Sequence, residues 1–138
     1  MKAFSKSALA AAALLAFGLG TASAGDVAVK LSGDQEVPPT PSTATGSGTI
    51  TVKDDKSVSG SVKTSGVEGT AAHIHLAEAG KNGPPIITLA KGEGGSWSVP
   101  ADAKLTDEQF AAFKAGNLYV NVHSAAHKPG EIRAQLKP

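Results

Sequence analysis

The sequence predicts an all-β protein, an antiparallel β-sandwich or barrel that is interrupted by one short helix. After residue 24 the chain is dense in Gly, Thr, Ser and Val. These residues form short runs in which apolar and polar side chains alternate, and turn residues separate the runs. Alternation with a period of two gives each strand one apolar and one polar face, which suits strands packed around a single core.

Eight strands account for these runs. A Pro-rich connection over residues 35–43 separates the first two strands, because proline cannot donate a hydrogen bond inside a sheet. A turn at residues 54–56 makes a hairpin of the second and third strands. The expected strands cover residues 27–31, 48–52, 58–64, 70–76, 86–89, 96–99, 118–123 and 131–136.

One helix is expected before the last two strands. Thr106 is a good N-cap, and Gln109 three residues later completes a capping box. Phe110 and Phe113 share one helix face, and Gly116 occupies the position that ends the helix. We expect the two Phe rings to plug one end or edge of the β-structure.

Residues 1–24 are expected to be a cleaved signal peptide. Lys2 and Lys6 flank the start of the chain, an apolar stretch follows over residues 8–19, and Ala-Ser-Ala at 22–24 is typical of a cleavage site. The apolar stretch is too short for a confident membrane helix. The sequence thus predicts a periplasmic or secreted protein, with no membrane association after cleavage and one domain over residues 25–138.

Composition excludes several partners and chemistries. The 13 Lys and Arg residues include Lys2 and Lys6, so residues 25–138 carry 11 basic against 12 acidic residues and a net charge of −1. This balance gives no basis for binding nucleic acid or an anionic membrane. The chain has no Cys, which excludes thiolate metal ligands and cysteine nucleophiles.

All four histidines lie in two short motifs. His73 and His75 have the i, i+2 spacing that puts both rings on one face of a strand, while His123 and His127 span a strand end and the following turn. Four imidazoles can surround one Cu(II) or Zn(II) ion. The motifs therefore predict one divalent metal per chain, provided that the strand at 70–76 lies close to the strand at 118–123.

An interpretation without metal remains open. In it the imidazoles hydrogen-bond to loop carbonyls and brace the Gly-rich connections. In the metal interpretation, Asn121 and Glu131 are candidates to orient the ligand rings. We expect Glu36 to form an ion pair with a basic residue of the last strand, Arg133, and the alternative is that Glu36 is a carboxylate ligand. Trp97 and Tyr119 are expected to pack in the core or at a sheet edge.

Three segments together resemble a known family. They are Leu-Ser-Gly-Asp-Gln-Glu-Val-Pro-Pro at 31–39, Ala-Ala-His-Ile-His at 71–75, and Gly-Asn-Leu-Tyr-Val-Asn-Val-His-Ser at 116–124, which continues into Pro-Gly-Glu-Ile-Arg-Ala-Gln-Leu at 129–136. They resemble the CHRD domain, which is named for the chordin proteins and is widespread in bacterial secreted proteins. The resemblance implies an all-β, immunoglobulin-like domain and defines no activity of its own.

The His-Ile-His segment also looks like the copper-binding strand of Cu/Zn superoxide dismutase, another β-sandwich protein. The chain lacks that enzyme's cysteine pair and its full set of ligands for two metals, so dismutase activity is not carried over. We therefore expect metal storage, delivery or protection through His73, His75, His123 and His127. The alternatives are a metal-free module that recognises another protein through loops or a sheet edge, and a metalloenzyme, for which the sequence names no substrate.

Overall fold

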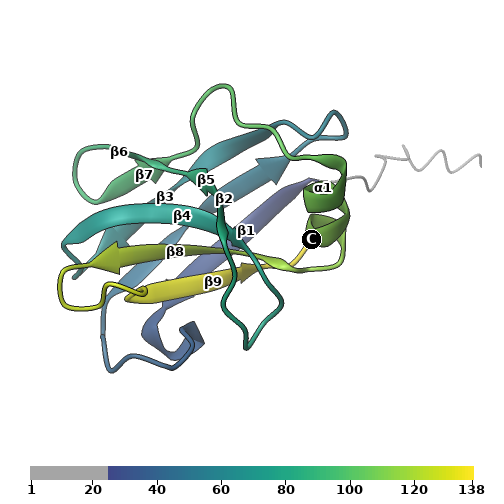
Figure 1. Cartoon of the computed structure of the whole chain (residues 1–138). Coiled ribbons are helices and arrows are strands. Elements are labelled where there is room, and N and C mark those ends of the chain that lie inside the picture. Colours follow the sequence, from purple (N-terminus) through teal and green to yellow (C-terminus); the bar gives the residue numbers. More distant parts are fainter. Residues whose placement is uncertain (1–24) are drawn as a thin grey trace, which may run out of the picture.

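The computed structural model describes residues 25–138, so the expected signal peptide lies outside the described residues. Within this range no helix is long and apolar enough to cross a membrane. Nine strands form one antiparallel sheet (Figure 1). They are β1 (Asp26–Ser32), β2 (Thr45–Val52), β3 (Val58–Ser65), β4 (Gly69–Leu76), β5 (Pro85–Thr88), β6 (Ala90–Lys91), β7 (Ser96–Ser98), β8 (Leu118–Ser124) and β9 (Ile132–Leu136).

The sheet curls into a nearly closed barrel, which confirms the predicted fold class. Its strand order is β5-β4-β8-β9-β1-β2-β3-β7-β6, so β5 and β6 are the two edges. These edges are consecutive in the chain and only Leu89 separates them. The Leu89 amide donates to the carbonyl of Ala72 in β4, 2.9 Å away. The two ends of the sheet therefore meet at Leu89, and little free strand edge is left.

Most expected strands agree with the observed ones within a few residues. Two short elements were not expected, the strand β6 and the 3₁₀ turn η1 (Gly33–Gln35). Each has only two or three residues, too few for a periodic pattern in the sequence. β6 depends on its pairing with β7, where Lys91 lies opposite Trp97.

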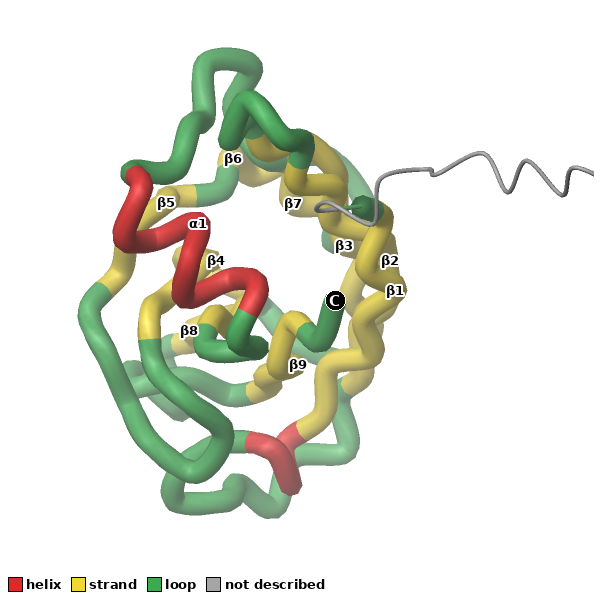
Figure 2. Tube along the Cα trace, turned by 90° about the vertical axis from the view of Figure 1, so that its right-hand side faces the viewer, coloured by secondary structure: helices red, strands yellow, loops and turns green. Residues whose placement is uncertain are grey.

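The apolar faces of the strands fill the barrel, and a helix covers one end of it (Figure 2). The helix, α1 (Asp107–Lys114), begins at the predicted cap, where Thr106 and Gln109 form a capping box. Phe113 is fully buried and Phe110 packs against the core. The predicted plug of two Phe rings is thus confirmed.

Outside the barrel, two loops cover the polar face of β4, β8 and β9. The loop after β4 is joined to this face by Gln135, whose amide donates to the Ala77 carbonyl. The Pro-rich connection after η1 is joined to it by Thr40, whose hydroxyl donates to the Glu131 carbonyl. These loops bury a polar layer of side chains, which we define as Glu36, His75, Tyr119, Asn121 and Arg133.

Candidate metal centre

Strands β4 and β8 are hydrogen-bonded neighbours, which is the condition that the metal prediction required. His73 lies opposite Asn121, and His75 lies opposite Tyr119. His123 faces Ala71 on the same polar side. Because these positions alternate with core residues, their side chains project from one face of two adjacent strands. The register therefore brings the His-Ile-His motif and His123 together.

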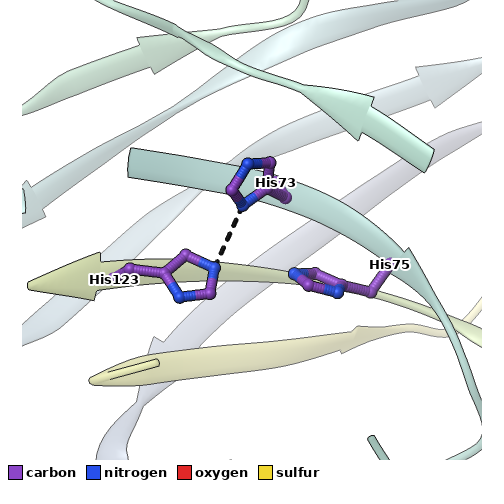
Figure 3. A group of neighbouring side chains, drawn as sticks. All are labelled: His73, His75 and His123. Atoms are coloured by element: carbon purple, nitrogen blue, oxygen red, sulfur yellow. Dashed lines mark hydrogen bonds between the residues drawn. The ribbon is translucent and has the colours of Figure 1, made fainter. Parts of the chain in front are cut away.

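The structure places His73, His75 and His123 in one cluster, the histidine triad (Figure 3). One ligand nitrogen from each ring lies within 4.8 Å of the others. Nitrogen ligands about 2.0–2.1 Å from a tetrahedral zinc ion lie about 3.3 Å apart. The triad is therefore slightly wider than a metal-bound set, and small side-chain rotations would close it. His75 is buried while His73 and His123 are partly exposed, so solvent reaches one side of the triad.

Hydrogen bonds fix the proton positions on two of the rings. Nδ1 of His75 lies 2.8 Å from the carbonyl oxygen of Gly83, and Nδ1 of His123 lies 2.7 Å from that of Lys128. A carbonyl oxygen only accepts hydrogen bonds, so both Nδ1 atoms must carry the proton. In the neutral rings the lone pair is then on Nε2. A carbonyl that holds Nδ1 in this way is the usual partner of a metal-ligating histidine.

The third ring completes the cluster by contacting His123. Nδ1 of His73 lies 3.0 Å from Nε2 of His123. Because the His123 atom is an acceptor in the neutral ring, His73 donates through Nδ1 in the metal-free protein. Coordination through Nδ1 of His73 would require its other tautomer, with the proton on Nε2.

The electrostatic environment favours neutral histidines. Burial lowers the pKa of His73, and the nearby His123 lowers it further. Burial also lowers the pKa of His75, although its hydrogen bond to Gly83 works in the opposite direction. A metal binds the neutral form of imidazole, so the lowered pKa values of His73 and His75 reduce competition from protons at these two rings.

An aromatic stack supports the buried member of the triad. The His75 ring stacks on the Tyr119 ring, with centroids 4.7 Å apart and planes 3° from parallel. The Arg133 guanidinium lies 3.4 Å from the centroid of the Tyr119 ring. The side chain of Arg133 is 1% exposed and donates to Asn82, Glu78 and Gln135. Tyr119 thus packs between a cation and a candidate ligand. It is buried, as the sequence predicted, although it packs in the polar layer rather than in the apolar core.

Three buried polar atoms in this layer have no hydrogen-bond partner among the described residues. They are Nε2 of His75, Oδ1 of Asn121 and Oε2 of Glu36. Burial raises the pKa of Glu36 to about 7, although the charge of Arg133 and the Asn121 amide oppose this shift. Buried polar atoms without partners are uncommon, and a ligand, a water or a proton can satisfy each of them.

The structure does not bring His127 into the triad. His127 lies in the turn between β8 and β9, where its backbone amide donates to the Ser124 hydroxyl. Its carbonyl accepts from the amide of Gly130. These bonds fix the backbone of His127 in the turn. His127 lines a cavity of about 200 Å³ between this turn and the Pro-rich connection.

The roles expected for two acidic residues change. Glu36 and Arg133 do not form the expected ion pair; among residues 25–138 the ion pairs join Lys56 to Asp107 and Lys81 to Glu78. The loop after β4 supplies carbonyl and amide oxygens that occupy the Arg133 guanidinium instead. Glu36 is not part of the triad.

Glu131, which was expected beside the ligand rings, binds two serines. Its carboxylate accepts hydrogen bonds from Ser42 at 2.7 Å and from Ser124 at 2.6 Å. Burial alone would raise the pKa of Glu131, but these hydrogen bonds lower it overall. Glu131 therefore fastens the Pro-rich connection to the end of β8. Asn121, the other residue expected there, does lie among the histidines.

Comparison with known proteins connects this architecture to one family. Residues 27–136 match the family model of the CHRD domain, which is nearly the whole described range. Comparison with curated proteins and with solved structures gave no match. The match covers the triad and all nine strands, except for the first residue of β1.

Proposed function

The chain belongs to the CHRD domain family, and we propose that it binds one Cu(II) or Zn(II) ion through His73, His75 and His123. The observation that carries this proposal is the convergence of three imidazoles from two neighbouring strands. The fixed Nδ1 protons of His75 and His123 support it, because they leave the lone pair of each ring on Nε2. Nε2 of His123 becomes available to an ion once His73 changes to its other tautomer.

The donor set limits the choice of ion. Imidazole nitrogens without thiolates suit zinc and Cu(II) better than Cu(I), and three ligands leave at least one further coordination position. His73 and His123 are partly exposed, so an ion can enter and leave while the barrel stays folded. This accessibility fits storage, delivery or protection, carried out by an exported protein in the periplasm or outside the cell.

Calorimetric titration of the chelator-treated protein with Cu(II) and Zn(II) at neutral pH tests the proposal. We expect one ion per chain, and an affinity at least ten-fold weaker in His73→Ala and in His123→Ala. His127→Ala is the matched control, because it removes an imidazole outside the triad and should bind as the unaltered protein does. Absence of binding, or equal binding by all variants, would overturn the proposal.

A metal-free interaction module is the second candidate. The bonds from His75 to the Gly83 carbonyl and from His123 to the Lys128 carbonyl favour it, because they brace loops without an ion. The sheet edges are short and meet at Leu89, so such a module would use its loops. A protein partner that stays bound in the presence of a chelator, and that His73→Ala does not release, would support this candidate.

A further inference from the structure

Asn121 lies in the middle of the polar face that carries the triad. It is the cross-strand partner of His73 and precedes His123 by two residues on the same face of β8. Its side chain is 1% exposed, yet Oδ1 has no hydrogen-bond partner among the described residues. A buried amide oxygen without a partner costs about 1–3 kcal/mol of stability, so a ligand that contacts Oδ1 would recover this cost.

The other half of the amide is held in place. Nδ2 of Asn121 donates to the carbonyl of Pro129, 3.4 Å away. The Glu36 carboxyl and this Nδ2 both lie against Gly130, where even a Cβ atom would clash with Oε2 of Glu36 and with Nδ2. Because the NH₂ group faces an acceptor on this side, Oδ1 is turned the other way.

A second buried atom of the polar layer also lacks a hydrogen-bond partner, Nε2 of His75. Asn121 and His75 lie on the same polar face, because Asn121 is opposite His73 and His75 follows His73 by two residues. Nδ1 of the His75 ring is bound to Gly83, so Nε2 is the ring atom that is left to bind a ligand. Each of the two atoms offers a lone pair, and a cation bound to both would satisfy both.

We propose that Oδ1 of Asn121 is a fourth donor to the ion held by His73, His75 and His123. This inference rests on the proposed function and deepens it, since it assigns an N₃O donor set from strands β4 and β8 alone. A neutral amide oxygen is a harder donor than imidazole, and a mixed nitrogen and oxygen set favours Cu(II) over Cu(I). The turn residue His127 is then not needed to complete the site.

The test compares Cu(II) binding and the Cu(II) electron paramagnetic resonance spectrum of three variants. Asn121→Leu keeps the size of the side chain and removes the donor, so we expect at least ten-fold weaker binding and a changed spectrum. Asn121→Asp keeps an oxygen at the same place and adds charge, so it should bind at least as tightly, also with a changed spectrum. Asn117→Leu is the matched control, because it makes the same substitution at a residue outside the triad and the polar layer and should change neither property.

The outcomes separate this inference from the proposal on which it rests. If the unaltered protein binds no Cu(II), the proposed function fails and this inference fails with it. If the unaltered protein binds and both Asn121 variants keep its affinity and its spectrum, only the fourth donor is overturned. Should Asn121→Leu fail to fold, as judged by circular dichroism, Asn121→Ala takes its place, because it also removes the amide oxygen and introduces no new ligand.

Discussion

His75 and Tyr119 stack in parallel and also share one partner, Gly83. Nδ1 of His75 donates to the Gly83 carbonyl, and the Tyr119 hydroxyl accepts from the Gly83 amide at 3.1 Å. A single residue of the loop after β4 therefore fixes both the ring of a candidate ligand and the ring that packs on it. The geometry of the triad depends on this loop, although no ligand comes from it.

This shared contact predicts different effects for two substitutions of Tyr119. Tyr119→Phe removes only the hydroxyl, so we expect a loss of about 1 kcal/mol in the free energy of unfolding. Tyr119→Leu also removes the ring that lies against His75 and Arg133, and it should cost about 3 kcal/mol. Urea denaturation of the chelator-treated proteins measures both. Equal losses would show that the stack adds nothing beyond the hydroxyl.

The pKa of Glu36 predicts how stability changes with pH. Its ordinary value is 4.5 and burial raises it to about 7 in the folded protein. Between these values the folded state holds a proton that the unfolded state has lost, so Glu36 reduces stability as the pH rises from 4.5 to 7. The neutral variant Glu36→Gln lacks this effect. Its stability relative to the unaltered protein should therefore rise across that range by an amount on the order of 2–3 kcal/mol.

Urea denaturation at several pH values, with a chelator present, gives this difference. Glu93→Gln is a suitable control, because Glu93 is exposed and the substitution removes the same charge. A pH-dependent difference for Glu36→Gln that is no larger than the difference for Glu93→Gln would contradict the prediction.

The lowered pKa values of two histidines predict the opposite trend, which is best measured in the Glu36→Gln background. Burial lowers the pKa of His73 and of His75 from the ordinary value of 6.5. The unfolded state therefore takes up protons first, and stability falls as the pH drops below about 6.5. Replacing His75 by Gln should make this acid loss smaller. If the acid loss is the same with and without His75, its ring is not held neutral by burial.

Much of the architecture could be predicted because it depends on local signals. The alternation of apolar and polar residues located the strands, and the pair of Thr106 and Gln109 marked the start of the helix at the observed capping box. The convergence of His73, His75 and His123 followed from strand faces once the expected strands at 70–76 and 118–123 were neighbours. Whether these two strands are neighbours depends on segments that are far apart in the sequence, so the sequence alone could not establish it.

The polar layer could not be predicted for a related reason. A polar strand face normally faces water, and nothing in the spacing of Glu36, Asn121 or Arg133 indicates that two loops cover them. The same limit explains the Glu36 and Arg133 pair: opposite charges suggested a direct contact, whereas loop oxygens occupy the guanidinium. His127 was grouped with the other histidines by sequence distance, and the conformation of the turn decided its position.

Gly130 provides a test of how closely the polar layer is packed around Asn121. Its backbone has φ +133°, and a Cβ there would meet Oε2 of Glu36 and Nδ2 of Asn121. Gly130→Ala therefore combines backbone strain with a clash against two buried polar groups, and we expect a loss of about 3 kcal/mol or more in the free energy of unfolding.

Gly80→Ala is the matched control, because Gly80 also has a positive φ, +83°, but nothing lies within 4 Å of its Cβ position. The control should cost only about 1 kcal/mol, from strain alone. Thermal or urea denaturation compares the two, and equal losses would mean that Glu36 and Asn121 can move away from Gly130 without cost.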